Sequence, residues 1–521
     1  MSKWLVIISI CFGFLNNKVY AQIKNLPNHQ YEEIDGDYFL SIRNYVNALE
    51  IFKGIYKTKP TDKNINYKIA FCYLKTNTNR LEATKYLEFL IKEEKCEPEV
   101  WFDLGYVYAL ANKLDDAIKA FEKYKKLSPK KADKADYKIA QCNNAKEFMK
   151  HPVNVSFYNL GKDLNSPYPD YYPWITKDEN FLAFTSRRKG NIGGTAEEDG
   201  YYSSDIYTSV AVNGKWSKAK NVGPLINTPL DEQVVGLKSD GSEMIVYVDH
   251  MEVYGDLFSS KKKGTAFQKM IPLADQINKK IEHSGSVCDE GNTIFFVRKE
   301  KMNEDLTTDI YMSRMLPSGI WGEPQKLNDN VNSPYNEDFP YLALDGKTLY
   351  FSSEGHNSMG GYDLFKCEWD SEKNTWSKAT NLGYPINTTD DDRSISLSND
   401  HTVGYVSSIR PDGFGDLDIY RIKFNANQKF IIFKGNILYE DTTNAPKQKI
   451  ATINATEQKT NEEYTFATNP SNGSFLLALP EGNYNLSVTS LGYRKIKETI
   501  SISDIGTETI EKTKTFKLIK E

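Results

Sequence analysis

Short runs rich in aromatic and aliphatic residues, separated by turns that contain Gly and Asp, repeat through the middle of the chain. In the clearest unit, residues 332–383, we predict strands at Phe339–Leu344, Thr348–Ser353 and Tyr362–Trp369, with a fourth run from Trp376. Tyr, Phe and Leu suit a packed pleated surface, and Gly and Asp tolerate the backbone of tight turns. The pattern therefore predicts one four-stranded sheet unit.

The unit occurs in five copies, each marked by the tripeptide Asp-(Ile/Leu)-(Tyr/Phe). The tripeptide begins at Asp205, Asp256, Asp309, Asp363 and Asp418. A period of about 50 residues, with roughly four strands in each repeat, is typical of radial blades. We therefore predict a five-bladed all-β propeller over residues 151–427.

The last copy lacks a fourth strand, but a matching segment precedes the first copy. VNVSFYNLG at residues 153–161 matches KATNLG at 378–383, and the Asn-Ser-Pro triplet at Asn165 matches the one at Asn332. A first strand that completes the last blade closes the ring and removes its open sheet edges. The sequence therefore predicts that the two ends of the propeller pair with each other.

Upstream of the strands, apolar residues follow helical spacing. Ala48, Ala83 and Ala117 recur at intervals of about 34 residues, and a large apolar residue follows each of them four positions later. Gly105 and Ala117 are small enough to let two antiparallel helices approach closely. We predict an α-helical solenoid over residues 22–150, in which residues 132–148 form a capping helix.

The two ends of the chain have patterns of their own. Residues 428–521 contain short alternating strands with Gly and Pro turns, which predicts a β-sandwich. Residues 1–21 have Lys3, an apolar run too short to span a bilayer, and the cleavage-like Val19-Tyr20-Ala21. We therefore expect a signal peptide. Ile10 before Cys11 disfavours a lipoprotein.

Composition limits the function classes. The chain has 521 residues, of which 40% are hydrophobic and 26% charged, as in ordinary globular proteins, and its length allows several domains. The formal net charge of −5 comes without a basic stripe and argues against nucleic-acid binding. Five of the six cysteines follow the signal segment and are scattered, which leaves one disulfide possible but favours buried free thiols.

Candidate catalytic and metal-binding chemistry is sparse. His29 and Glu32 have the H-x-x-E spacing of zinc ligands, but a lone short motif usually arises by chance. Residues 412–418 are rich in side-chain oxygen, as calcium loops are, yet similar Gly-x-Asp segments recur in other copies, which favours a turn. Three acidic runs, Asp231-Glu232, Glu337-Asp338 and Asp390–Asp392, either line a channel or, as we favour, form solvated corners. We predict no enzymatic activity, catalytic residue, metal site or cofactor.

Three family resemblances follow from these residues. The repeat formed by Trp101, Leu104, Gly105, Tyr108, Ala117, Phe121 and Pro129 resembles the tetratricopeptide (TPR) repeat. The five copies resemble the TolB-like, PD40 (WD40-like) propeller. The order of Gly435, Pro446, Gly473, Phe475, Leu479, Pro480, Gly482, Tyr484, Gly492 and Tyr493 resembles the carboxypeptidase-regulatory-like (transthyretin-like) domain.

The TPR resemblance implies site residues. The concave groove of that family corresponds here to Tyr67, Phe71, Phe102 and Tyr106, which would bind a protein partner. The alternative is that these rings pack between repeats, since aromatic stripes at helical spacing are usually core. If the rings are exposed together, they form an apolar patch that requires a partner.

The order of the segments resembles the periplasmic TPR–propeller–OmpA-family proteins, some of which serve type IX secretion. The OmpA-like domain usual there is missing from this sequence, so peptidoglycan binding is not implied. The resemblance implies a non-enzymatic scaffold in the periplasm, at or near the outer membrane, that binds outer-membrane or secretion-machinery proteins, with membrane association peripheral at most. The alternative is a propeller that binds envelope glycan or an exported substrate, which an aromatic-lined propeller mouth would favour.

Overall fold

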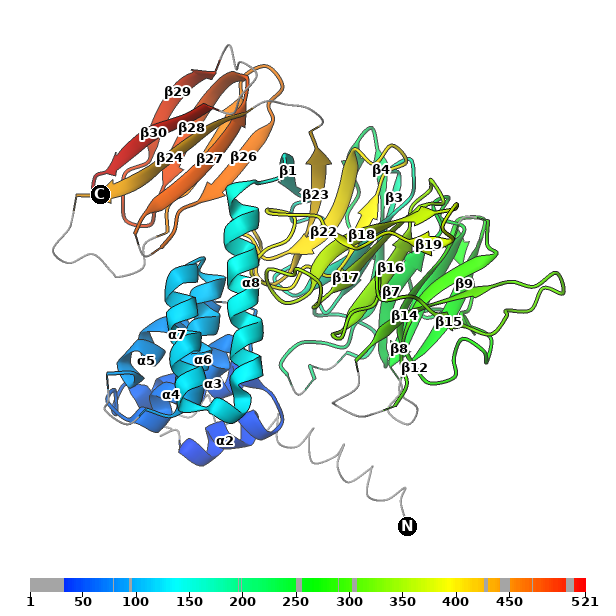
Figure 1. Ribbon diagram of the computed structural model, residues 1–521, viewed down its shortest axis with the longest axis horizontal. Helices are drawn as coiled ribbons and strands as arrows, with labels where there is room; N and C mark the ends of the chain where they lie inside the picture. Colours follow the sequence, from blue (N-terminus) through cyan, green and yellow to red (C-terminus); the bar gives the residue numbers. More distant parts are fainter. Residues whose placement is uncertain are drawn as a thin grey trace.

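The computed structural model describes residues 32–521 except 78, 93–95, 195, 198, 250–254, 289, 302–306, 426–429, 441–449, 471 and 503–509. The signal peptide predicted at residues 1–21 therefore lies outside the described residues, as does His29. Within the described part, a helical region comes first, five sheets follow, and two further sheets end the chain (Figure 1).

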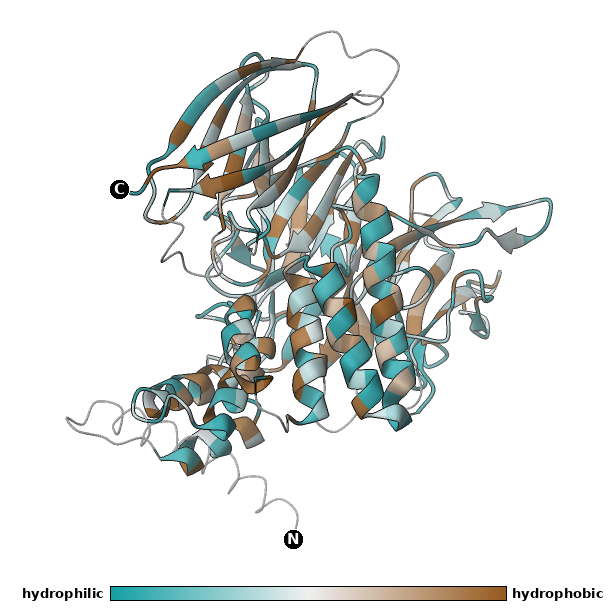
Figure 2. Cartoon of the chain, turned by 60° about the vertical axis from the view of Figure 1, so that its left-hand side comes forward, coloured by the Kyte–Doolittle hydropathy of each residue, from teal (hydrophilic) through white to brown (hydrophobic). Residues whose placement is uncertain are grey.

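The helical region consists of antiparallel neighbours that pack in chain order. Its helices are α2 (Glu33–Ser41), α3 (Tyr45–Tyr56), α4 (Lys63–Leu74), α5 (Ala83–Leu90), α6 (Pro98–Leu110), α7 (Leu114–Leu127) and α8 (Ala132–Lys150), with 3₁₀ turns η1 (Arg80–Glu82) and η2 (Pro129–Lys131). Each helix carries both hydrophobic and hydrophilic segments, as one-sided burial requires (Figure 2). A Cβ added at Gly105 would lie 2.7 Å from the Phe121 ring, which confirms the predicted close approach of α6 and α7.

Five sheets form the middle of the chain. The first contains β2 (Asp170–Ile175), β3 (Phe181–Ser186), β4 (Asp205–Val212), β5 (Lys215–Trp216) and β6 (Lys220–Asn221), and the second contains β7 (Asp231–Leu237), β8 (Glu243–Asp249), β9 (Asp256–Lys263), β10 (Ala266–Phe267) and β11 (Ile271–Pro272). The third contains β12 (Ile281–Val287), β13 (Thr293–Lys299), β14 (Asp309–Arg314) and β15 (Gln325–Lys326). The fourth contains β16 (Glu337–Leu342), β17 (Thr348–Ser353), β18 (Asp363–Asp370), β19 (Thr375–Trp376) and β20 (Thr380–Asn381). The fifth contains β21 (Ile395–Leu397), β22 (Val403–Ser408) and β23 (Asp418–Phe424), together with β1 (Val155–Asn159).

The sheets are arranged as a ring. Neighbouring first strands contact each other from β21 to β2, β2 to β7, β7 to β12 and β12 to β16, so these strands are innermost. The fourth and fifth sheets share a hydrophobic cluster that includes Leu364 and Ile395. The architecture is that of a propeller, as the five sequence copies predict.

The first strand of the propeller closes the ring. β1 pairs antiparallel with β23, with Val155 opposite Phe424 and Asn159 opposite Tyr420. The fifth sheet therefore takes its outermost strand from the front of the propeller sequence. This pairing confirms the predicted closure.

One side-chain clamp recurs in all five sheets. In the best example, Asn332 Oδ1 accepts a hydrogen bond from Ile310 N at 2.8 Å, and Asn332 Nδ2 donates to Ile310 O at 3.1 Å. The equivalent pairs are Asn165 with Ile419, Asn227 with Ile206, Asn278 with Leu257, and Asn387 with Leu364. The amide thus binds both backbone groups of the apolar residue in each Asp-(Ile/Leu)-(Tyr/Phe) tripeptide, while that residue's side chain fills the core.

The two C-terminal sheets share one hydrophobic core. They consist of β27 (Ser474–Pro480), β24 (Phe430–Tyr439) and β30 (Ile510–Leu518) in one sheet, and β26 (Glu463–Ala467), β25 (Thr452–Glu457), β28 (Gly482–Thr489) and β29 (Ile496–Ile502) in the other. An ion pair between Lys423 and Glu462, at 2.6 Å, links β23 of the propeller to this region.

Candidate functional site

Helix α8 attaches the helical region to a loop of the fourth sheet. The Tyr137 ring stacks on Tyr335 with centroids 4.6 Å apart, and its hydroxyl donates to Glu354 O at 2.6 Å. One turn further along α8, Gln141 Nε2 donates to Ser358 Oγ at 2.8 Å. Both side chains bind the same loop, so α8 is held at two successive turns.

The segment after α4 makes a second contact with the propeller. Both terminal nitrogens of the Arg80 guanidinium bind the Asp390 carboxylate, one of them at 2.9 Å. Asn77 Nδ2 donates to Asp416 Oδ1 at 2.9 Å, and Tyr201 OH donates to Asp416 Oδ2 at 2.7 Å. A bidentate Arg–carboxylate pair fixes orientation as well as distance. The helical region is therefore attached to the propeller at two places, through α8 and through the segment that follows α4.

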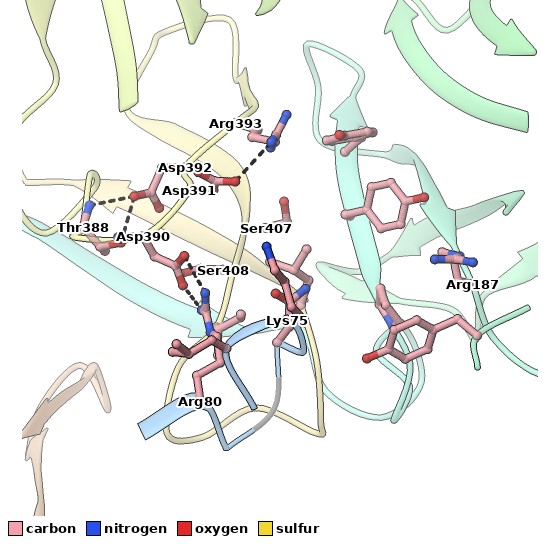
Figure 3. A pocket seen from close by; sticks show the side chains of 18 of the residues that line it. Lys75, Arg80, Arg187, Thr388, Asp390, Asp391, Asp392, Arg393, Ser407 and Ser408 are labelled. Carbon is pink, nitrogen blue, oxygen red and sulfur yellow. Dashed lines mark hydrogen bonds and ion pairs between the residues drawn. The ribbon is translucent and has the colours of Figure 1, made fainter. Parts of the chain in front are cut away.

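Between these contacts lies a cavity of about 460 Å³ (Figure 3). Both regions line it: Leu74, Lys75, Asn77, Arg80 and Tyr106 from the helices, and Pro169, Tyr171, Tyr172, Arg187, Tyr201, Gln233, Thr388, Asp390, Asp391, Asp392, Arg393, Ser407, Ser408, Ile409 and Leu417 from the propeller. Arg80 and Lys75 enter from one helical segment, and Lys75 points into the space (Figure 3).

The cations of the propeller wall are neutralised by nearby acids. Arg393 lies 3.1 Å from Asp391, and Arg187 pairs at 2.5 Å with both Glu197 and Asp199. Of the cations that line the cavity, Lys75 is the one for which the described residues provide no acidic hydrogen-bond partner. The cavity thus has matched charges along its propeller wall and one additional positive charge from the helical side.

The Asp392 carboxyl is buried beside this wall. Its Oδ2 accepts hydrogen bonds from Thr388 N at 2.6 Å and from Thr388 Oγ1 at 2.9 Å. Burial, and then the nearby Asp363 carboxyl, raise the pKa of Asp392 well above its usual range. Asp392 therefore acts as a hydrogen-bonded structural group rather than as a free anion.

The innermost strands present a ring of unlike side chains. A buried acid lies at or near the start of each, and the residue that follows this acid is Tyr171, Gln233, His283, Asp338 or Arg393 in successive sheets. Three of the five, Tyr171, Gln233 and Arg393, line the cavity. The structural position thus repeats while the side chain that occupies it differs from sheet to sheet.

Asp338 is the single carboxylate in this ring. Ser284 Oγ donates to Asp338 Oδ1 at 2.5 Å, and Arg393 lies 3.9 Å from Oδ2. Glycoside hydrolysis commonly requires two carboxyl groups that face each other across the bond. This ring does not supply such a pair.

The four residues predicted for the groove lie half-buried on α4 and α6. Tyr67 OH donates to Asp103 at 3.2 Å, and burial raises the pKa of this tyrosine. Phe71 meets Tyr45 edge-on at 5.9 Å.

The other two predicted residues lie further toward α8 and the propeller. Phe102 packs against Phe121 and Tyr124 at 5.3 and 5.1 Å. Tyr106 lines the cavity, where burial and then Asp390 raise its pKa to about 12. Each of the four rings packs on neighbours and is half-buried, and partner binding by them stays a prediction.

The acidic runs differ from their prediction. Glu232, Glu337 and Asp392 are buried, and Asp390 pairs with Arg80, so the expected solvated corners are wrong at these positions. Each buried acid lies at or near the start of an innermost strand and accepts hydrogen bonds from nearby backbone or hydroxyl groups. Arg80 was not predicted from the sequence, because its partner Asp390 lies far away along the chain.

The remaining chemical candidates are structural in the described residues. Asp412 accepts a hydrogen bond from Tyr420 OH at 2.9 Å, and Phe414 N donates to Asp418 at 2.7 Å, so the oxygen-rich segment forms a turn. Within the described part of the chain, no three His, Cys, Asp or Glu side chains form a group able to hold a metal ion. Cys72, Cys96, Cys142, Cys288 and Cys367 are free thiols, as favoured from the sequence.

Comparisons with known proteins give fold-level likenesses. No family model matches the sequence. No curated protein matches it either. Among solved structures, TolB from Acinetobacter baumannii is 15% identical with a TM-score of 0.32, and the match covers 51% of this chain and 56% of that one. A TolB structure from Agrobacterium tumefaciens is 14% identical with a TM-score of 0.28, over 53% of this chain and 98% of that one.

A third similar structure is an enzyme. The β-1,2-mannobiose phosphorylase from Listeria innocua is 8% identical with a TM-score of 0.34, over 52% of this chain and 96% of that one. At these TM-scores no ligand or activity follows for this chain, and the propeller assignment rests on the strand pairing described above. Among the described helices, none is long and apolar enough to cross a membrane.

Proposed function

We propose that the protein is a non-enzymatic binding module in which the helical region and the propeller together receive a segment of a protein partner. The observation that supports this proposal is the cavity to which both regions contribute. A pocket at a domain interface, with a few convergent polar groups, is a usual place for a ligand. Partner recognition would then require the two regions to stay in their present arrangement.

The finer parts of the proposal come from the repeats. The helices would be TPR repeats with α8 as the cap, and the C-terminal sheets would be a transthyretin-like sandwich that serves as a spacer or docking module. The protein would act in the periplasm, at or near the outer membrane, and its partners would be outer-membrane or secretion-machinery proteins. Peptidoglycan is not among the proposed ligands.

Binding fits the cavity better than catalysis. The arginines of its walls are held by acids, and the buried Asp392 is held by Thr388. A nucleophile requires an adjacent base that is in turn oriented by a third group. The charged groups here stabilise one another, which suits preformed recognition.

Site-specific photo-crosslinking tests the proposal. A benzoylphenylalanine placed at Tyr106 or at Tyr201 in the full chain should capture a discrete protein in the native cells, since both side chains line the cavity. The control position is Leu491, which is fully exposed in the C-terminal region. Adducts from both cavity positions that are missing at position 491 support the proposal. A folded protein that yields no protein adduct at either cavity position refutes it.

One observation favours a second candidate, a glycan or other small polar ligand. Tyr171, Tyr172 and Tyr201 of the propeller line the cavity together with Tyr106 of α6, so the cavity is rich in aromatic rings. Sugar rings stack on such side chains while Arg and Asp bind their hydroxyl groups. Calorimetric titration with envelope oligosaccharides tests this candidate, and binding that is lost in Tyr201→Ala would favour it over a protein partner.

A further inference from the structure

Three lysines lie over aromatic rings on the side of the helices that faces the propeller. Lys75 Nζ is 5.4 Å from the Phe71 centroid, Lys134 Nζ is 4.1 Å from Phe102, and Lys138 Nζ is 6.0 Å from Tyr106. We call these six residues the basic groove. A lysine ammonium group therefore lies over each of three rings that are predicted to bind a partner.

The lysines of the basic groove lack the acidic partners that seven other lysines of the helical region have. These pairs are Lys68 with Glu33 and Asp37, Lys85 with Glu82, Lys119 with Asp116, Lys125 with Asp136, Lys131 with Glu99, Lys146 with Asp115, and Lys150 with Glu147. Within the described residues, Lys75 and Lys134 have no such ion pair. Lys138 donates to the neutral Gln141 at 2.7 Å.

The acids near these lysines are already engaged. Asp103, which lies near Lys75 and Lys134, accepts the hydrogen bond from Tyr67, and burial raises its pKa to about 6. Glu354 and Asp391, which lie near Lys138, accept hydrogen bonds from Asn336 and Arg393. These acids therefore compensate the three lysines only in part. An ammonium group above a ring still has N–H bonds directed away from the ring, and these can bind a carboxylate.

We propose that the basic groove binds an extended acidic segment of the protein partner, with its Asp and Glu carboxylates on Lys75, Lys134 and Lys138. This inference rests on the proposed function and specifies the chemistry of the partner. The rings of Phe71, Phe102 and Tyr106 provide apolar surface for the methylene groups of Glu side chains. Charge complementarity thus selects the partner, and the rings add contact area.

The groove continues into the cavity. Lys75 and Tyr106 belong to both, since they also line the space between the helices and the propeller mouth. A segment bound along α8 and α6 therefore reaches the ring of unlike side chains at Tyr171, Gln233 and Arg393. The lysines bind the carboxylates of the segment, and the propeller mouth contacts the residues that follow them.

The test measures peptide affinity in the full-length protein. The probes are a fluorescein-labelled peptide of alternating Glu and Gly, its Gln counterpart, and an oligogalacturonate, with binding followed by fluorescence anisotropy or, for the sugar, calorimetry. We expect the Glu peptide to bind more tightly than the Gln peptide. The double variant Lys75→Gln/Lys134→Gln should weaken Glu-peptide binding about tenfold. Raising NaCl should weaken binding to the unsubstituted protein more than to the variant.

A matched control uses lysines that also lie over rings. Lys113 lies 5.1 Å from the Tyr108 centroid and Lys123 lies 5.9 Å from Trp101, on another face of α6. Lys113→Gln/Lys123→Gln should bind the Glu peptide as the unsubstituted protein does. Equal losses in both double variants, equal affinity for Glu and Gln peptides, or binding of oligogalacturonate alone would overturn the inference.

The outcome is separable from that of the proposed function. If photo-crosslinking at Tyr106 captures a protein while Lys75→Gln/Lys134→Gln leaves that adduct and its salt dependence unchanged, the partner binds there but not through acidic residues. The inference then fails and the binding function stands. If no adduct forms, the proposed function itself fails.

Discussion

The asparagine clamp predicts a large and local loss of stability. We consider Asn332→Ala, because Asn332 is only 3% exposed and makes three hydrogen bonds, with Ile310 N at 2.8 Å, Ile310 O at 3.1 Å and Leu327 O at 2.9 Å. The substitution removes all three while the backbone of the fully buried Ile310 stays in place. Its N–H then lacks both its partner and water.

The magnitude follows from the number of bonds. A typical intramolecular hydrogen bond contributes about 1 kcal/mol net, and an unsatisfied buried donor adds a penalty of roughly 1 to 3 kcal/mol. We therefore expect the free energy of unfolding of the propeller to fall by about 4 to 6 kcal/mol. With a urea m-value of roughly 3 kcal/mol/M, the midpoint should fall by about 1 to 2 M.

The assay is urea unfolding followed by the fluorescence of the propeller tryptophans. The control is Asn399→Ala, an exposed asparagine in a turn of the same propeller for which the structure gives no side-chain hydrogen bond. That change should alter the free energy of unfolding by no more than about 0.5 kcal/mol. A loss at Asn332 no larger than the loss at Asn399 would refute the reasoning, since the clamp would then contribute nothing to the ring.

Three further predictions concern pH, helix packing and the domain contact. Burial raises the pKa of Glu337 to about 8, so its favourable contribution is full below the unfolded pKa of about 4.3 and is lost as pH rises toward 8. Glu337→Gln should flatten this decline, and parallel curves of unfolding free energy against pH for both proteins would contradict it. Gly105→Ala places a Cβ 2.7 Å from the Phe121 ring and should destabilise the helices by about 1 to 3 kcal/mol. Melting followed by far-ultraviolet circular dichroism checks this change, and a higher Tm would show that the helix preference of Ala outweighs the clash. Arg80→Ala removes the contact with Asp390 and should speed amide hydrogen exchange in residues 74–80 and 388–393, while unchanged protection there would show that the contact does not hold the regions together.

Local patterns predicted the repeated parts of the fold. The strand expected at Thr348–Ser353 is β17 with the same bounds, because its alternation and flanking turns lie within one short window. The closing strand was also found, since NLG at residues 159–161 repeats NLG at residues 381–383. A repeated unit carries its structural signal several times, which makes both inferences strong.

The site depended on contacts that leave no local pattern. Arg80 and Asp390 meet because the helical region docks on the propeller, and neither residue shows this pairing in its own neighbourhood. Runs of acids are usually solvated, so Asp390–Asp392 was expected at a corner, but Thr388 satisfies the buried Asp392. The groove rings were predicted from their repeat positions, and their role stays a prediction, whereas the lysines above them come from other turns and another helix.

The closure of the ring by β1 and β23 determines how force passes through the molecule. The helical region precedes β1 and the C-terminal sheets follow β23, so both are tethered to the same blade. Tension between them enters at Val155 and at Phe424, which lie opposite each other at one end of the ladder. Once the contacts of α8 with the loop of the fourth sheet have broken, such a load peels β1 and β23 apart one hydrogen-bonded pair at a time.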